Sequence, residues 1–190
     1  MYSLYKQVET AEEQNLFNQI FQTVFEEMNY DYEDPSDAIN LLVKNKFNKY
    51  SGTIQFASFK PKSKQTTLEY PELFLASDIL SNVDDQYIRE VDKVAVIASE
   101  RKNGTLDNII ETIYLYTKEH DIRYLVGEMN PVFFRALRVM YGLSPLKASK
   151  LVRGKEAGYS TQPTILVMPD IWRQYEMKKA SVMSERGITV

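Results

Sequence analysis

Residues 94–110 read VAVIASERKNGTLDNII, and this stretch decides the fold class. It opens with the continuous apolar run Val94–Ile97, which is typical of a strand that is buried on both faces. A turn containing Gly104 follows, and Leu106, Ile109 and Ile110 then recur at helical spacing. The stretch therefore predicts a strand, a tight turn and a helix in direct succession.

The turn carries the pattern R-x-x-G, with Arg101 and Gly104 just before the predicted helix. Backbone amides at a helix N-terminus, together with the positive end of the helix dipole, bind phosphate groups. A glycine lets the main chain approach the anion closely. We therefore predict a phosphate-binding turn made of Arg101, Lys102, Asn103, Gly104 and Thr105. An ordinary strand-to-helix turn is the alternative, because R-x-x-G occurs by chance in many chains.

The rest of the chain alternates strand and helix patterns. A capping box of Thr10 and Glu13 precedes a helical apolar stripe, which predicts a helix over Ala11–Met28. The other predicted elements are a short strand around Tyr2 to Val8, a helix that Ser36 caps and that carries residues 39–43, strands at 53–59, 91–98, 122–126 and 164–168, helices at 106–114 and 133–140, and a strand edge or loop at 73–75. This order indicates an α/β, three-layer domain with a central sheet.

Length and residue counts exclude several kinds of site. At roughly 150 residues per domain, 190 residues suggest one domain over 1–190. Without cysteine and with one histidine, the chain cannot build a disulfide framework, a zinc–thiolate site, a cysteine nucleophile or a multi-histidine metal cluster. That histidine, His120, lies between Glu119 and Asp121, which predicts an exposed helix end. We therefore expect proton chemistry without a metal, from Glu, Asp, Tyr, Lys or water.

The charge balance argues against a nucleic-acid partner. The chain has 23 basic and 26 acidic residues, a net charge of -3 and a pI near 5.4, whereas nucleic-acid binders carry a basic domain or stripe. No apolar run approaches the roughly 18 residues of a membrane span, and the start MYSLYKQVET lacks the features of a signal peptide. We therefore expect a cytoplasmic protein.

The turn and its flanks resemble the GNAT acyltransferase superfamily, whose donor-binding motif R-x-x-G-x-[GA] follows a strand valine at this spacing. Within it, the chain is similar to the acyl-homoserine lactone (autoinducer) synthases and the N-acyl amino acid synthases. The similar segments are residues 10–30 (TAEEQNLFNQIFQTVFEEMNY), 52–54 (G-T-[LIV]-R in the family), 70–74, 90–96 (E-x-S-R-[LF]-A-V in the family) and 158–170 (GYSTQPTILVMPD). The resemblance implies a mixed, mostly antiparallel sheet flanked by helices.

Several residues depart from the family pattern. Phe21 and Gln55 stand where the synthases have arginines, and Asp92 and Lys93 replace a serine and an arginine. Leu106 replaces the second glycine of the turn. Such a turn would bind coenzyme A more weakly while still accepting a phosphopantetheine arm. Arg138 stands where many family members place a tyrosine, four residues before a Gly-Phe pair.

The resemblance implies direct N-acyl transfer from a thioester, either acyl-coenzyme A or an acyl-carrier protein, to the amine of a small molecule. The carbonyl would be polarised by backbone amides around Val96, Ile97 and Ala98. Glu128 is the first candidate base because it follows a strand where the neighbouring strand would diverge, and Glu100 is the second. Tyr141 is the candidate acid. An exposed glutamate and a core tyrosine are the respective alternatives.

Further residues are candidates for substrate and partner binding. In the resemblance, Glu90 and Lys93 shape the substrate site, although a surface salt bridge is the alternative. Phe56 and Phe134 are candidates for lining an acyl pocket, unless they simply fill the core. The basic run Lys147, Lys150, Arg153 and Lys155 would dock an acidic carrier protein or form a solvated face.

Two other functions compete with the synthase-like one. The first is an acetyl-coenzyme A-dependent N-acetyltransferase on the same fold. The second is a catalytically silent domain that binds an acylated ligand or a protein, which the substitutions at positions 21, 55, 93 and 106 keep open.

Overall fold

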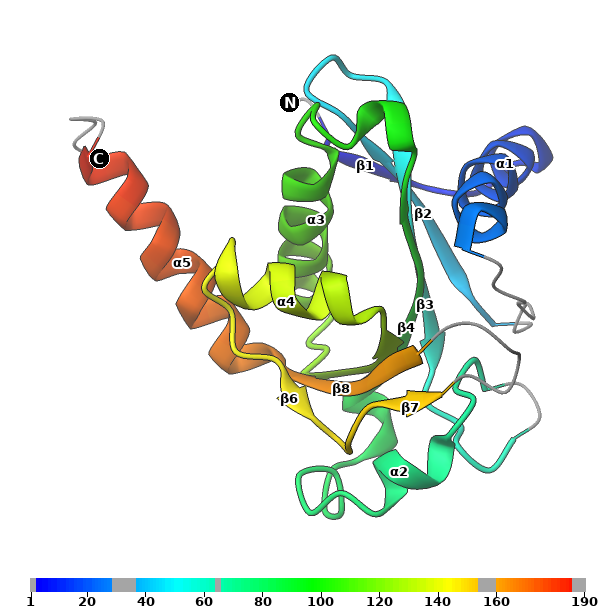
Figure 1. Cartoon of the computed structure of the whole chain (residues 1–190), viewed down its shortest axis with the longest axis vertical. Coiled ribbons are helices and arrows are strands. Elements are labelled where there is room, and N and C mark those ends of the chain that lie inside the picture. The colour runs from blue at the N-terminus through cyan, green and yellow to red at the C-terminus, as the bar shows by residue number, and fades with distance from the viewer. Residues whose placement is uncertain (1–2, 29–36, 64–65, 154–159, 186–190) are drawn as a thin grey trace.

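The computed structural model describes residues 3–28, 37–63, 66–153 and 160–185 (Figure 1). Its elements in chain order are β1 (Tyr5–Gln7), α1 (Ala11–Met28), β2 (Ile39–Lys44), β3 (Tyr50–Ser58), α2 (Pro71–Leu75), β4 (Ile88–Val96), α3 (Thr105–Glu119), β5 (Tyr124–Met129), α4 (Pro131–Val139), β6 (Leu146–Lys147), β7 (Val152–Arg153), β8 (Ser160–Val167) and α5 (Met168–Glu185), with short 3₁₀ turns before and after β4. Tyr2, Ser36 and Lys155 lie outside the described ranges, as do residues 29–30 and 158–159 of the similar segments.

One sheet runs through the molecule in the order β1-β2-β3-β4-β5-β8-β6, and β7 also pairs with β8. All neighbouring strands are antiparallel except β4 and β5, which are parallel. The predicted mixed, mostly antiparallel sheet is therefore confirmed.

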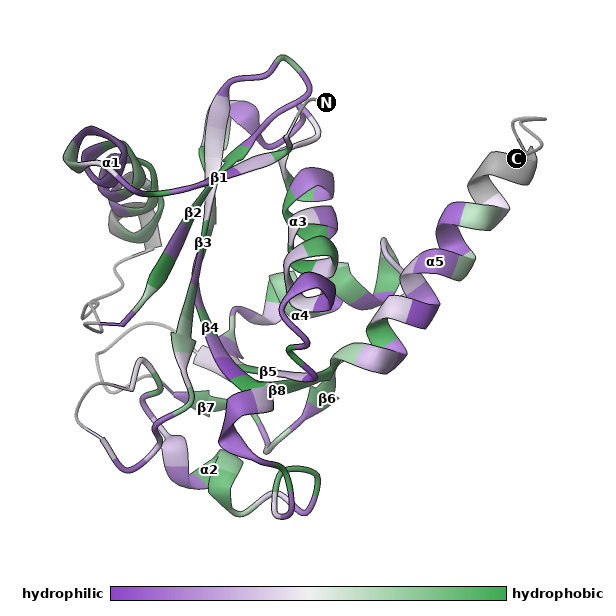
Figure 2. Ribbon diagram, turned by 180° about the vertical axis from the view of Figure 1, so that it is seen from behind, coloured by the Kyte–Doolittle hydropathy of each residue, from purple (hydrophilic) through white to green (hydrophobic). Residues whose placement is uncertain are grey.

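Helices cover both faces of this sheet, as Figures 1 and 2 show. On one face, α3 and α4 pack against the sheet through a large apolar cluster that includes Ile54, Ile109 and Leu137. On the other face, α1 packs against β2 and β4, and the segment containing α2 packs against β4, β5 and β8. This arrangement confirms the predicted three layers.

The predicted first helix has the expected cap and buried stripe. Thr10 and Glu13 form the reciprocal capping box, in which each side chain accepts a bond from the other residue's N–H at 3.2 Å. Phe17, Ile20 and Phe21 are buried against the sheet. The cap and the stripe together confirm α1 over the predicted range.

Two predicted elements are wrong. Residues 39–43 belong to strand β2 and not to a helix, because Leu41–Val43 are fully buried on both faces of the sheet between β1 and β3. Residues 73–75 belong to the short helix α2 and not to a strand or loop; Pro71 stands in its first turn and Phe74 is buried. The sequence patterns also missed α5, β6 and β7. Among the described residues, no helix has an apolar stretch that could span a membrane.

Candidate active site

The parallel strands β4 and β5 pair over only three residues. The pairs are Ile88–Tyr124, Arg89–Leu125 and Glu90–Val126. Beyond these pairs, β4 continues to Val96 and β5 to Met129, but the two strands no longer pair with each other. The strands diverge here, and we call the opening between residues 91–96 and 127–129 the split.

Gly127 marks the narrow end of the split. A Cβ atom at this position would lie 2.7 Å from the carbonyl oxygen of Val91 and 3.1 Å from its Cγ1. Glycine therefore permits the close approach of the two backbones. The next residues, Asp92 and Glu128, lie on the sheet face that α1 and α2 cover, because strand side chains alternate and Val126 packs beside Phe74.

A β-bulge interrupts β4 at Lys93. Gln55 pairs with Asp92 and Thr53 with Ala95, so β4 contains one extra residue. Lys93 adopts a φ of 48°, and its carbonyl oxygen accepts a 2.7 Å bond from the Thr53 hydroxyl. The bulge changes the direction of the β4 backbone beside the split, a feature that no sequence pattern announced.

The β4–α3 turn lies at the far end of β4. Gly104 caps α3 in the left-handed conformation with a φ of 76°, and no side chain caps the first turn of the helix. The Thr105 hydroxyl lies 2.9 Å from that of Ser51, which ties the start of α3 to β3. The N–H groups of this first turn and the positive end of the helix dipole suit a bound phosphate.

Glu100 and Ile97, two candidate residues of the turn, make hydrogen bonds within the turn and to β3. Glu100 accepts 2.8 Å bonds from the side chains of Asn45 and Asn103, and these bonds lower the pKa of its carboxyl group. The Ile97 N–H donates to the Ser51 carbonyl at 3.1 Å, so this amide is already occupied. Glu100 thus fixes the turn, and the backbone donors at Val96 and Ala98 stay predictions.

Glu128 is a carboxylate at the edge of the split, on the same sheet face as Asp92. Its Oε1 accepts a 2.8 Å bond from the N–H of Tyr70. Burial raises the pKa of Glu128 to about 7, and the nearby charges of Glu69 and Asp92 add to that effect. A carboxylate of this pKa is well matched to accept a proton near neutral pH. This residue was predicted as the first candidate base.

Glu90 is buried at the start of the split. Its side chain is fully inaccessible to solvent. Lys93 is equally inaccessible, with its Nζ 4.7 Å from the centre of the Phe21 ring. A surface salt bridge between Glu90 and Lys93 is therefore wrong, since neither side chain reaches the surface.

A chain of amides connects the sheet with α1. Gln55, which stands where the synthases have an arginine, donates to Asn40 at 2.8 Å, Asn40 donates to Gln14 at 3.0 Å, and Gln14 donates to Asn18 at 2.8 Å. Gln55 is fully buried. These hydrogen bonds form a polar connection between β3, β2 and α1, and it begins at the position where the synthases have an arginine.

No family model and no curated protein sequence matches this chain. Solved structures do match. FeeM, an N-acyl amino acid synthase from uncultured soil microbes, superposes with a TM-score of 0.67 at 15% identity, covering 92% of this chain and 96% of FeeM. MesI, a CoA-dependent acyl-homoserine lactone synthase, gives 0.56 at 15% identity and covers 92% and 94% of the two chains.

BjaI, another CoA-dependent acyl-homoserine lactone synthase, gives a TM-score of 0.61 at 13% identity, covering 87% of this chain and 82% of BjaI. The fold is that of the GNAT acyltransferases. This result confirms, at the level of the fold, the resemblance drawn from the sequence.

In this GNAT fold, the structure brings some predicted residues to the split and places others elsewhere. Glu90, Lys93 and Glu128 lie beside it. Tyr141 donates a 2.7 Å bond to Asp107 of α3, and burial raises its pKa, so this hydroxyl holds its proton firmly. Phe56 stacks on Tyr116 inside the core, with ring centres 4.7 Å apart.

The remaining predicted residues lie at the two ends of α3. Arg101 and Lys102 are exposed in the turn, and Leu106 packs against the core beneath α3. His120 caps the end of α3 and is exposed, as its polar neighbours predicted. These positions leave Arg101 and Lys102 as the exposed cations of the turn.

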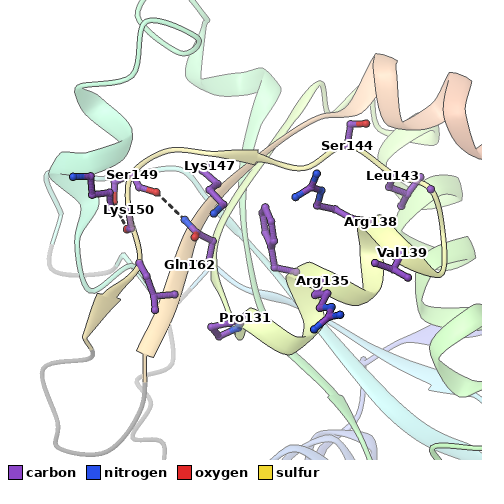
Figure 3. A pocket seen from close by; sticks show the side chains of 13 residues that line it. Pro131, Arg135, Arg138, Val139, Leu143, Ser144, Lys147, Ser149, Lys150 and Gln162 are labelled. Carbon is purple, nitrogen blue, oxygen red and sulfur yellow. Dashed lines mark hydrogen bonds between the residues drawn. The ribbon is translucent and has the colours of Figure 1, made fainter.

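A basic groove lies beside α4, outside the split (Figure 3). It has a volume of about 1040 Å³. Phe134 forms part of its lining beneath Lys147, whose Nζ lies 5.6 Å from the centre of the Phe134 ring. The cations that line the groove are Arg135, Arg138, Lys147 and Lys150. Only Lys147 and Lys150 belong to the basic run that the sequence indicated.

Proposed function

We propose that the protein is an N-acyltransferase that moves an acyl group from a thioester donor to the amine of a small molecule, such as an amino acid derivative. The observation that carries this proposal is the split, with Glu128 at its edge and the start of α3 at the other end of β4. The likeness in fold to N-acyl amino acid and acyl-homoserine lactone synthases supports the same reaction class.

The proposed reaction is a direct transfer. The amine nitrogen attacks the carbonyl carbon, the C–N bond forms and the C–S bond breaks. Glu128 accepts the proton that the amine gives up, which its pKa of about 7 permits near neutral pH. The departing thiolate takes a proton from water, because the hydroxyl of Tyr141, the predicted acid, already donates to Asp107 and holds its proton firmly.

Coenzyme A is the donor type that the neighbours MesI and BjaI use. In this chain, the first turn of α3 would hold the donor's phosphates, with Arg101 and Lys102 as nearby cations. The thioester would lie in the split and the amine would approach from the side of Glu128. The cytoplasmic location stays a prediction.

A spectrophotometric assay of free thiol tests the function. Purified protein is mixed with acetyl-, octanoyl- or palmitoyl-coenzyme A and a panel of amino acids and their derivatives, and mass spectrometry identifies the acyl amide. We expect amide formation with thiol release. A preference for acetyl-coenzyme A would favour the simple N-acetyltransferase, and no thermal shift with any thioester would favour a silent domain.

Gly52 offers a test of the donor site. A Cβ there would lie 2.8 Å from Thr105 Cγ2 and 3.1 Å from both the Ala95 carbonyl oxygen and Ile109 Cδ1. Gly52→Ala should therefore displace the start of α3 and raise the KM for acyl-coenzyme A about tenfold or more. Steady-state kinetics measures this effect, with circular dichroism as the check on folding. An unchanged donor KM would contradict the proposed phosphate site.

The basic groove tests the second donor type. An acyl-carrier protein is acidic and would dock on the cations of the groove. The double variant Arg135→Glu/Arg138→Glu should then raise the KM for acyl-carrier protein about tenfold or more while leaving that for acyl-coenzyme A unchanged. Arg173→Glu on α5 is the matched charge reversal away from the groove. Equal effects on both donors, or none on either, would argue against carrier-protein docking there.

A further inference from the structure

Residues 60–63 and 66–70 are the described part of the connection between β3 and α2, and two glutamates hold this segment at the split. Glu90 on β4 binds its middle part and Glu128 on β5 binds its end. The two strands diverge directly after Glu90 and Val126. The segment therefore links the two strands at the point where their own pairing ends.

The Glu90 carboxylate makes four hydrogen bonds with this segment. Its Oε1 accepts from the N–H of Lys60 at 3.3 Å and from the Thr66 hydroxyl at 2.7 Å. Its Oε2 accepts from the N–H and the hydroxyl of Thr67 at 2.7 and 2.9 Å. Because Glu90 is fully buried, these bonds form away from solvent. Glu90 is an anchor for Thr66 and Thr67.

Three residues after Thr67, the same segment reaches Glu128. The Tyr70 N–H donates to Glu128 at 2.8 Å, and the Tyr70 hydroxyl donates to the Arg153 carbonyl at 2.6 Å. Between the two anchors, Leu68 is buried in the apolar cluster that also contains Val126. The position of Tyr70, and with it the covering of Glu128, depends on where Thr67 is held.

We propose that Glu90 is a positioning residue, which holds Thr66–Tyr70 across the split and thereby fixes the carboxylate of Glu128. The proposal rests on the proposed role of Glu128 as the base. A positioning role explains why the fully buried carboxylate of Glu90 lies beside the split and yet bonds to Thr66 and Thr67. A buried apolar residue at position 90 would leave the N–H of Thr67 without its acceptor.

Carbon-13 NMR tests the coupling without relying on activity. The Cδ signal of Glu128 is identified as the one that is absent from Glu128→Gln, and its titration midpoint is compared among variants. Glu69 on the segment and Asp92 on β4 are the charged groups that act on Glu128. In Glu90→Gln the segment loosens and more water reaches the half-buried Glu128. Lost burial lowers its pKa and loss of the Tyr70 N–H bond raises it, and burial is the larger effect, so the midpoint should fall from about 7 toward the ordinary 4.5 by roughly one pH unit or more.

Kinetics gives the second readout. Glu90→Gln should lower kcat about 10- to 100-fold with the donor KM unchanged, because the base is misplaced and the donor site is intact. The double variant Thr66→Val/Thr67→Val keeps Glu90 and removes two of its donors, so it should shift the Glu128 titration in the same direction by less. If Glu90→Gln fails to fold, this double variant tests the proposal in its place.

Glu13→Gln is the matched control, since Glu13 also accepts two backbone N–H bonds but lies on α1. It should leave the Glu128 titration unchanged. Identical Glu128 midpoints in the wild type and in the folded Glu90 and threonine variants would overturn the proposal. Wild-type activity in Glu128→Gln would overturn the proposed base instead, and the titration would still decide whether Glu90 positions the Glu128 carboxylate.

Discussion

Replacing Glu128 by glutamine is expected to lower kcat/KM about 10²- to 10⁴-fold, the usual contribution of a positioned general base. Glutamine retains an oxygen that accepts from the Tyr70 N–H but cannot take a proton from the amine. Steady-state kinetics with a saturating donor measures the loss. Glu72→Gln, which removes an exposed carboxylate of α2, is the control and should retain wild-type rates. Rates within twofold of wild type in Glu128→Gln would remove Glu128 from the mechanism.

The same substitution is expected to stabilise the fold above neutral pH. The pKa of Glu128 is raised from 4.5 to about 7 in the folded protein, so the folded state binds this proton more tightly than the unfolded chain. Stability therefore falls as pH rises through this window, and above it the ionised carboxylate costs about 3 kcal/mol. Glutamine removes that cost.

Urea unfolding measures the difference. At pH 8, Glu128→Gln should be more stable than the wild type by up to about 3 kcal/mol, and near pH 4 the two proteins should have similar stability. A gain in stability joined to a loss of activity is the pattern of a residue kept for function. Equal stability of the wild type and Glu128→Gln at both pH values would mean that burial does not favour the protonated form of Glu128.

Gly127→Ala is the second substitution with a large expected effect. Its Cβ would lie 2.7 Å from a backbone oxygen of β4, which no side-chain rotation can relieve. The strands must move apart at the narrow end of the split, and we expect a loss of about 1–3 kcal/mol in stability. Because Glu128 is the next residue, kcat should fall about 10- to 100-fold even where the variant folds.

Gly142→Ala provides the comparison for Gly127→Ala. Gly142 has a φ of 66° with no heavy atom within 4 Å of an added Cβ, so alanine there meets strain but no clash. Its cost should be about 1 kcal/mol with no change in the titration of Glu128. If Gly127→Ala and Gly142→Ala behave alike in unfolding and kinetics, the close approach of β4 and β5 does not shape the site.

The order of elements was predictable where the sequence pattern is local. The capping box at Thr10 and the strand-turn-helix around Gly104 specify their structures through neighbours a few residues apart. Residues 39–43 were misassigned because four apolar residues in five fit a helix stripe and a doubly buried strand equally well. Pairing with β1 and β3 decides in favour of the strand, and the sequence of residues 39–43 does not state which strands will pair with it.

The candidate site was predictable only in part. Glu128 could be identified because it ends an apolar strand, but its pKa depends on burial beneath a segment 58 residues away in sequence. The bulge at Lys93 depends on the register between β3 and β4, which the sequence of β4 does not state. Glu90 carries no local sign that its partners are Thr66 and Thr67, because hydrogen bonds between distant segments leave no periodic pattern.

The brief pairing between β4 and β5 also has a mechanical consequence. The sheet consists of two groups of strands, β1 to β4 and β5 with β8 and β6, which share only three residue pairs. A force that pulls β3 away from β8 would load those three pairs and the hydrogen bonds that Glu90 and Glu128 accept from residues 66–70. The opening that we propose for the substrate thus lies beside the shortest of the three pairings that connect β3 with β8.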